Sequence, residues 1–435
     1  MDAAAVALVT LVLFAWGLFS ARLGRADLSA PIVFVTVGLL LSEVLHVVEP
    51  DVPQESVKLL AEVTLVWVLF ADASRVRLRD LRGDIGLYTR LLAVGLPLTI
   101  AAGALLAAWL FDGIGVWLAL LIGAALAPTD AALGAAVMTN PAVPERVRRV
   151  LNVESGLNDG IATPVVMVAI AGAAAAEGIQ GQGLGGALID LAIGVGVGIG
   201  IGLSGGQAMR MARRRGWASE DFTGPAVLAL AMAAYAGCLW LDGNGFVAAF
   251  VAGLAFGNVA GRGGVKEVFY VEQTAGLVSL LTWLIFGAVA VPVVVEQTDW
   301  QVLAYAVLSL TVVRMLPVGL ALLGAKLPMR TVAFIGWFGP RGLASIIFAV
   351  IALEELHTEA DRAVAVIGIT VLLSVFAHGL SAQPLASRYG ASFAGTTPQP
   401  AGGESSPQIP VRGLLHRHPA AETTSPPVAE PHQRE

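Results

Sequence analysis

Residues 115–138 read GVWLALLIGAALAPTDAALGAAVM, an apolar run long enough to cross a membrane as a helix, with Pro128-Thr129-Asp130 in its middle. Proline removes a backbone donor and clashes with the preceding helical turn, and Thr and Asp side chains compete for nearby backbone groups. The run therefore predicts a membrane helix that is broken near its centre.

A second apolar run, residues 331–353, shares this interruption. It contains Gly339-Pro340-Arg341-Gly342, so proline and glycine again break a helix beside a charge. A single proline kink is common in membrane helices and needs no functional explanation. Two matched breaks, each next to a charged residue, favour a functional arrangement.

These two runs belong to a series of thirteen. The apolar runs bounded by charges lie near residues 3–20, 29–48, 56–73, 91–111, 115–138, 152–176, 184–209, 222–241, 245–260, 270–295, 300–324, 331–353 and 362–386. The broken runs are the fifth and the twelfth, and an odd offset of seven inverts their topology. The series predicts that spans 1–6 and 8–13 are inverted repeats, with a binding site where the broken helices meet.

The composition agrees with a membrane protein. Hydrophobic residues make up 56% of the 435 residues and charged residues 13%, far below the roughly 25% that is usual in soluble domains. The runs are continuous and do not alternate with polar residues, which excludes a barrel. No glycine-rich phosphate loop is present, which argues against an ATP-driven pump. We expect an all-α polytopic membrane protein with about 13 transmembrane helices.

The basic residues predict how the chain is oriented. Short cytoplasmic loops of membrane proteins are enriched in Arg and Lys, whereas the loops on the other side are poor in them. One set of alternate loops holds Arg22, Arg25, Arg75, Arg77, Arg79, Arg82, Arg90, Arg146, Arg148, Arg149, Arg210, Arg213, Arg214, Arg215, Arg262, Lys266, Lys326 and Arg330. The other set holds mostly acids, among them Glu49 and Asp51, with a lone Arg362. We expect a cell-membrane protein with its N-terminus outside and its C-terminus in the cytoplasm.

The character of the chain changes after the last run. Residues 387–435 are rich in Pro, Ser, Thr and Glu and show no apolar periodicity, which is typical of disorder. His416 and His418 in this segment lack further ligands that would complete a metal site. We predict a transmembrane domain over residues 1–386 and a disordered cytoplasmic tail over residues 387–435.

The sixth span carries the residues that best suit an ion site. It reads Glu154-Ser155-Gly156-Leu157-Asn158-Asp159-Gly160, and spacings of three and four place Ser155, Asn158 and Asp159 on one helical face. A hard cation such as Na⁺ prefers oxygen ligands, which this face and the loosened backbone near Thr129 can supply. Thiolate and imidazole ligands for a transition metal are lacking. Asp159 is the natural group to bind either a proton or a cation.

Charges inside spans are costly, so we expect the remaining ones to be compensated. Arg341 and Glu154 form the most plausible buried ion pair, because each would otherwise be an isolated charge in hydrocarbon. Asp130 lies where a broken helix exposes unpaired amides and a positive dipole end. We therefore expect Asp130 to play a structural role and not to bind the cation.

Three further polar residues leave their roles open. Asp72, at the end of the third span, either faces the cytoplasmic mouth of an ion path or only ends the span. Arg314 in the eleventh span is expected to support the core, with a partner that the sequence does not identify. His378 in the last span is more often a hydrogen-bonded packing residue than a proton relay.

Four motifs together resemble a known family. Pro128-Thr129-Asp130, the segment from Glu154 to Gly160, Gly245-Phe246-Val247-Ala248-Ala249-Phe250-Val251-Ala252-Gly253, and Gly339-Pro340-Arg341-Gly342 occur in the order and in the spans seen in NhaP-type sodium/proton antiporters. These belong to the monovalent cation:proton antiporter superfamily. The resemblance covers residues 1–386, and Glu-Ser-x-x-Asn-Asp is its most specific part.

The resemblance implies a thirteen-span fold with a six-helix core domain, a dimerisation domain, crossed broken helices in spans 5 and 12, and a homodimer. It implies that Asp159 and Ser155 bind the cation together with the backbone of Thr129, and that Asp72 matches an acidic position near the site. It also implies the pairing of Glu154 with Arg341.

Two positions qualify the resemblance. Asn158 precedes Asp159, and in the family an Asn at this position goes with electroneutral one-for-one exchange.

Family members commonly carry a proline after the Asp of the fifth-span motif, whereas here Ala131 follows Asp130 and Pro128 precedes Thr129. This departure predicts a helix break that is shifted by up to one turn.

The leading functional hypothesis is Na⁺/H⁺ exchange by alternating access, with cation and proton competing for Asp159. K⁺/H⁺ exchange is the close alternative, because nothing in the sequence fixes the size of the site. A sodium-coupled solute symporter is a weaker alternative from another class. An intramembrane aspartyl protease would need a second catalytic Asp in a Gly-x-Gly-Asp context, which is missing. We expect a transporter and not an enzyme, with no cofactor besides the transported ions and no nucleic-acid partner.

Overall fold

The computed structural model describes residues 3–46, 54–179, 183–261 and 264–392, and over these ranges its regular elements are all helical. This confirms the predicted all-α class. The last helix continues to Ala391, past the predicted end of the membrane domain at residue 386. The predicted loop acids Glu49 and Asp51 and the tail from residue 393 onward lie outside the described residues, so their structure stays a prediction.

Every predicted apolar run coincides with a helix or with two helical pieces in series. The first seven runs correspond to α1 (Ala3–Gly24), α2 (Ala30–Glu43), α3 (Gln54–Arg75), α4 and α5 (Ile85–Thr89, Leu96–Leu110), α6 and α7 (Val116–Ala125, Ala135–Met138), α8 (Glu145–Ala176) and α9 (Gly183–Arg214). The other six correspond to α10 (Glu220–Leu239), α11 (Gly245–Val259), α12 and α13 (Gly264–Ile285, Val291–Glu296), α14 and α15 (Trp300–Leu310, Val312–Ala321), α16 and α17 (Met329–Trp337, Leu343–Leu356) and α18 (Asp361–Ala391).

Length and composition make eight described helical segments able to cross a membrane, counting pieces that continue one another as one segment. Three shorter apolar helices, α2, α6 and α11, add to these. Two π-helical segments, Arg90–Gly95 and Phe286–Ala290, join helical pieces just before Pro97 and Pro292. A proline cannot donate to the turn before it, which accounts for the irregular turn at each place. The count of thirteen spans remains a prediction.

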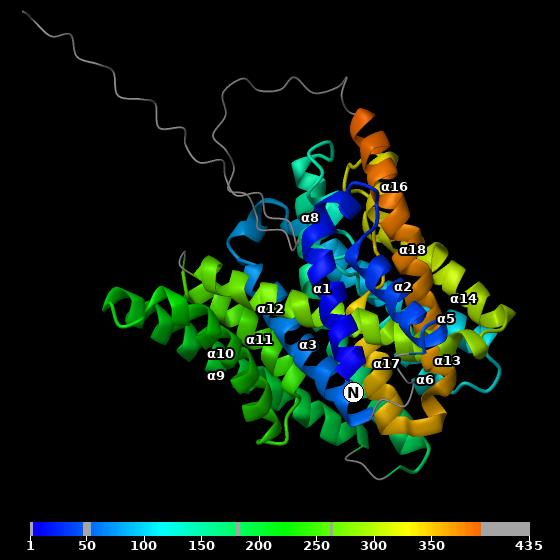
Figure 1. Ribbon diagram of the computed structural model, residues 1–435, viewed down its shortest axis with the longest axis horizontal. Coiled ribbons are helices and arrows are strands. Elements are labelled where there is room, and N and C mark those ends of the chain that lie inside the picture. The colour runs from blue at the N-terminus through cyan, green and yellow to red at the C-terminus, as the bar shows by residue number, and fades with distance from the viewer. Residues whose placement is uncertain (1–2, 47–53, 180–182, 262–263, 393–435) are drawn as a thin grey trace, which may run out of the picture.

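Glycine spacing fixes the packing of α9 on α11. Gly194, Gly198 and Gly202 recur every four residues of α9, and a Cβ at Gly198 would lie 2.7 Å from the carbonyl oxygen of Ala248 on α11. The opposite face of α11 packs on α3, where a Cβ at Gly253 would collide with the backbone of Phe70. Small residues let membrane helices approach this closely. Helix α11 is therefore held between α9 and α3, as the green and blue ribbons in Figure 1 show.

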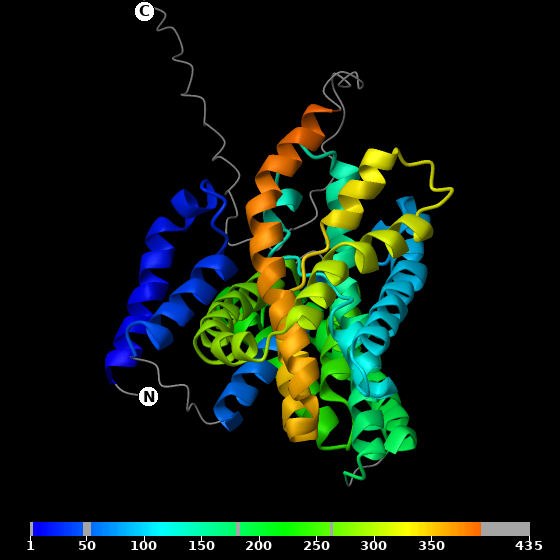
Figure 2. The same ribbon diagram turned by 90° about the vertical axis from the view of Figure 1, so that its right-hand side faces the viewer.

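Helix α8 lies at the centre of the molecule and α1 at its edge. Helix α8 packs against α3, α6, α9, α11 and α17. Glu154, Ser155 and Asn158 of α8 are accordingly buried inside the chain. The α1 helix contacts α2, where the rings of Trp16 and Phe34 meet edge to face at 5.9 Å, and it lies at the edge of the molecule in Figure 2. Helix α2 packs on α12, where a Cβ at Gly38 would collide with the carbonyl oxygen of Leu284.

Candidate functional site

The two predicted helix breaks are present, and they touch each other. Helix α6 ends at Ala125 and the next helical turn begins at Ala135, while α16 ends at Trp337 and α17 begins at Leu343. The backbone N–H of Asp130 in the first break donates to the carbonyl oxygen of Pro340 in the second at 2.8 Å. The predicted crossing of broken helices is thus confirmed.

Residues of the second break satisfy the carbonyl groups at the C-terminal end of α6. The hydroxyl of Ser345 donates to Ala125 at 2.6 Å, and Nη1 of Arg341 donates to Ala127 at 2.9 Å and to Pro128 at 3.2 Å. The C-terminal end of a helix carries partial negative charge, so a guanidinium there is favourable. Arg341 therefore neutralises the end of α6.

Asp130 makes the reciprocal contact. Its Oδ2 atom accepts from the backbone N–H of Leu343, the first residue of α17, at 3.0 Å, and its Oδ1 atom accepts from Ala132 at 2.6 Å. The N-terminal end of a helix carries partial positive charge, which a carboxylate stabilises. The position is the one expected for a compensating acid. Arg341 from the second break thus stabilises the C-terminal end of α6, and Asp130 from the first break stabilises the N-terminal end of α17.

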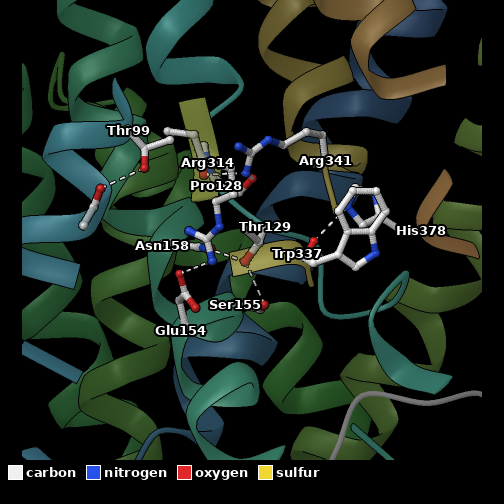
Figure 3. Close-up of polar contacts among 12 residues, drawn as sticks. Thr99, Pro128, Thr129, Glu154, Ser155, Asn158, Arg314, Trp337, Arg341 and His378 are labelled. Atoms are coloured by element: carbon white, nitrogen blue, oxygen red, sulfur yellow. Dashed lines mark hydrogen bonds and ion pairs between the residues drawn. The ribbon is translucent and has the colours of Figure 1, made fainter. Parts of the chain in front are cut away.

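A cluster of buried oxygen atoms lies beside the crossing. The hydroxyl groups of Thr129 and Ser155 are 2.9 Å apart, and the amide of Asn158 donates to the Thr129 hydroxyl at 2.7 Å. The three side chains are between 1% and 3% exposed, and Figure 3 shows them converging below the two breaks. The Oδ1 atom of Asn158 has no hydrogen-bond partner among the described residues. Such oxygens are suitable ligands for a hard cation.

The two candidate carboxylates lie on neighbouring helices, Asp159 on α8 and Asp72 on α3. Asp159 follows Asn158 directly and is half-buried. Asp72 is 7% exposed on α3, and its carbonyl oxygen would lie 3.6 Å from a Cβ placed at Gly156. Gly160 packs more closely still, because a Cβ at this position would overlap the ring of Phe250 on α11. Asp159 therefore sits where α8 passes between α3 and α11, with Asp72 on the neighbouring helix.

The predicted pairing of Glu154 with Arg341 is wrong. Oε1 of Glu154 accepts from Nη2 of Arg314 at 2.5 Å, while Arg341 is engaged with the carbonyls of the first break. Both guanidinium groups are buried, with 1% exposure for Arg314 and none for Arg341. Arg341 is drawn to the negative end of α6 by its place in the break, which leaves Arg314 for the carboxylate. Figure 3 shows the two arginines on different sides of Thr129.

Three polar residues that support the second break were missed or underrated from the sequence. Ser345 was not singled out, although a hydroxyl just after a helix break is a signal for a backbone contact. Ser374 and His378 on α18 are buried and hydrogen-bonded to the ends of the second break. Spacing of four residues on one helix could have linked these two, but not the backbone groups that they meet. Within the described ranges, no three His, Cys, Asp or Glu side chains are grouped to hold a metal ion.

Comparisons with known proteins identify several relatives of this chain. The curated relatives include the K(+)/H(+) antiporter NhaP2 of Shewanella sp. (strain MR-4), 28% identical over 373 residues, which are 83% of this chain and 62% of that protein. The K(+)/H(+) antiporter NhaP of Alkalimonas amylolytica is 26% identical over 376 residues, which are 85% of this chain and 63% of the relative. The chain thus spans less than two thirds of the length of these relatives.

The fold has a counterpart among solved structures. The sodium proton antiporter MjNhaP1 from Methanocaldococcus jannaschii, solved at pH 8, superposes with a TM-score of 0.73 at 21% identity, over 89% of this chain and 98% of that one. The family model described as "Sodium/hydrogen exchanger, transmembrane" matches residues 8–388, nearly the whole described part of the chain. With its crossed helix breaks and buried oxygen cluster, this chain belongs to the transmembrane sodium/hydrogen exchanger family.

Proposed function

We propose that this chain is a secondary transporter that exchanges a monovalent cation for a proton across the membrane by alternating access. The observation that carries the proposal is the cluster of Thr129, Ser155 and Asn158, three buried polar side chains at the crossing of two helix breaks. Asp159 follows Asn158 directly in the sequence. Polar groups in such a place are expensive and usually mark an ion path. Membership of the exchanger family supports the same function.

In the proposed cycle, Asp159 binds either the cation or the proton. Ser155 and Thr129 supply neutral oxygens that replace water around the bare cation, and Asp72 adds a second carboxylate from α3. A carboxylate that holds a cation cannot hold a proton at the same time, so competition at Asp159 couples the two fluxes. The function requires no covalent chemistry and no cofactor besides the transported ions.

Na⁺ is the cation that we propose first, and K⁺ is the alternative. The solved neighbour bears the name of a sodium proton antiporter, whereas the curated relatives bear the names of K(+)/H(+) antiporters. The matching family model is described as a sodium/hydrogen exchanger, which supports Na⁺ as the first candidate. A sodium-coupled symporter has no observation in its favour.

The exchange is proposed to be one for one. Asn158 is an amide and cannot ionise, so it contributes no second titrating group beside Asp159. Glu154 is held by Arg314, and the carboxylate of Asp130 is held by the backbone amides at the first turn of α17 and of its own break. Hydrogen-bond donors thus hold both acids, and neither is proposed to exchange a proton during the cycle. One cation then crosses for each proton, and no net charge moves.

We further propose a homodimer in the cell membrane, with the N-terminus outside and the C-terminus in the cytoplasm. The uneven distribution of Arg and Lys between alternate loops supports this orientation. Helices α1 and α9 bury only about a tenth of their most apolar stretch inside one chain, which supports their contact with lipid or a second copy. Labelling of a cysteine added to the tail, in intact and permeabilised cells, tests the orientation.

A proteoliposome assay tests the exchange itself. Purified protein is reconstituted with a pH-sensitive dye inside, and Na⁺, K⁺ and Li⁺ are pulsed outside in turn. We expect proton efflux with Na⁺, a half-saturating Na⁺ concentration that rises as the pH falls because protons compete, and an unchanged maximal rate. Proton movement that requires none of these ions, or that needs an added organic solute, would reject the proposal. A response to K⁺ alone would select the alternative.

A further inference from the structure

Both ends of the second helix break are attached to one face of α18. The carbonyl oxygen of Trp337, the last residue of α16, lies 3.0 Å from Nε2 of His378. At the other end, the backbone N–H of Arg341 donates to the hydroxyl oxygen of Ser374 at 2.7 Å. Ser374 and His378 are one helical turn apart on α18, so this turn bridges the whole unwound segment.

The donor at the Trp337 end of this bridge follows from chemistry. The Trp337 carbonyl can only accept, so Nε2 of His378 donates to it. The Ser374 hydroxyl accepts from Arg341, and this hydroxyl and the Ser374 backbone carbonyl each lie 3.1 Å from Nδ1 of His378. The imidazole therefore joins the two backbone groups that the break removes from regular helical bonding. The ring is 1% exposed and lies 5.2 Å from the Trp337 ring.

The bridge leads directly to the oxygen cluster. The side chain of Arg341 donates to the carbonyls of Ala127 and Pro128, and the next residue is Thr129. The hydroxyl of Thr129 contacts Ser155 at 2.9 Å. A shift in the Arg341 backbone therefore moves the segment that presents Thr129, and Figure 3 shows His378 and the cluster at opposite ends of this path.

We propose that His378 is a positioning residue for the ion site and sets the affinity for the cation, although it touches neither the cation nor Asp159. This inference rests on the proposed function. Without the imidazole, the Trp337 carbonyl loses its donor and the Ser374 hydroxyl keeps only Arg341, so the break relaxes toward other backbone contacts. Outer partners of ion ligands act in this way, by fixing the orientation of groups that make the contact.

The test compares His378→Leu, His378→Gln, Ser374→Ala and the control Thr370→Val in full-length protein. Thr370 is buried on α18 one turn before Ser374, and its hydroxyl bonds only within the helix, to Val366 at 2.7 Å. We expect His378→Leu to raise the half-saturating cation concentration by about 10-fold, as loss of an outer-shell partner does, with a smaller change in maximal rate. His378→Gln keeps a donor for Trp337 and should recover part of the affinity. Ser374→Ala added to His378→Leu should cost little more, because the two act in one chain.

A binding measurement complements the transport assay and makes the outcome decisive. The same variants are compared by the cation-induced rise in melting temperature of purified protein, which reports binding without transport. The inference is overturned if folded His378→Leu protein keeps the wild-type half-saturating concentration and the wild-type melting shift, or if it loses only maximal rate. It is also overturned if Thr370→Val loses as much affinity. Wild-type protein that melts later with cation but moves no protons would reject the proposed function and leave the positioning result standing.

Discussion

Arg314 Nη2 donates a hydrogen bond of 2.5 Å to Oε1 of Glu154, and neither residue is more than 3% exposed. Each charge is thus compensated by the other, deep in the membrane domain. Removing one partner of a buried ion pair costs about 3–5 kcal/mol, because the remaining charge is left alone. Arg314→Ala should therefore lower the melting temperature and yield of folded protein strongly. Glu154→Gln in the same chain should recover much of that loss.

Arg341 provides the matched comparison for this pair. Its guanidinium contacts the carbonyls of Ala127 and Pro128 and not Glu154, so Glu154→Gln should rescue Arg341→Ala far less than it rescues Arg314→Ala. Double-mutant cycles on the melting temperature measure both couplings. An equal rescue of the two arginine variants would show that the observed pairing does not govern stability.

Gly342 is predicted to tolerate no side chain. A Cβ at this position would overlap the carboxylate of Asp130, which holds the first turn of α17. Gly342→Ala should therefore displace Asp130 and abolish exchange, with a loss of folded protein. Gly196→Ala is the control, because nothing lies within 4 Å of the Cβ that it would add. If liposomes with Gly342→Ala protein exchange at the wild-type rate, then the contact of Asp130 with the first turn of α17 is not required for function.

The packing of α9 on α11 gives a prediction about stability alone. At Gly198 an added Cβ would lie 2.7 Å from the Ala248 carbonyl, whereas at Gly200 it would meet nothing within 4 Å. Gly198→Ala should cost about 1–3 kcal/mol, as overpacking typically does. Gly200→Ala should be neutral or slightly stabilising, because alanine favours a helix over glycine. Equal melting temperatures for the two variants would mean that α9 does not pack as described.

Asp159 should be indispensable for exchange and dispensable for folding. Asp159→Ala removes the only group proposed to alternate between binding a cation and binding a proton, so cation-driven proton flux should fall to the level of empty liposomes. The elution volume and melting temperature of the purified variant should stay close to those of the wild type. Asp190→Asn is the control, because Asp190 is another half-buried acid, on α9 and outside the oxygen cluster. Measurable exchange in Asp159→Ala would remove this residue from the proposed mechanism.

Electroneutral exchange can be tested by current. With one titrating carboxylate and an amide at Asn158, no sustained current should follow a sodium jump on a solid-supported membrane. Sodium-driven proton flux should be unchanged or faster when the voltage is clamped with valinomycin and K⁺, once K⁺ is shown not to be transported. A steady current that scales with protein density would require a second titrating acid, and Asp72, the other carboxylate proposed to hold the cation, would be the first to replace, followed by Glu154.

Local chemistry was enough to predict the helices and the places where they break. About twenty apolar residues predict a membrane helix, and Pro128 and Pro340 predict a break because a charged residue follows each within two positions. Helices α8, α10, α15 and α18 continue through a proline that lacks such a setting. The helical period alone placed Ser155 and Asn158 on one face of α8, and the structure joins both to Thr129. These features depend on neighbours within a few residues, which the sequence displays directly.

The partners of the buried charges were decided only by the tertiary structure. Arg314 and Arg341 are both arginines in late spans, and each was free, as far as the sequence tells, to pair with Glu154. Arg341 lies in a break that crosses the end of α6, so its guanidinium donates to the carbonyl of Ala127. The carboxylate of Glu154 therefore pairs with Arg314. The bridge from Trp337 through His378 was hidden for the same reason, since backbone groups released by a break carry no signature in the sequence. Buried polar groups pair because an unpaired one is costly, and each pairs with the group that lies near it. The distances between side chains on different helices are set only when the helices pack.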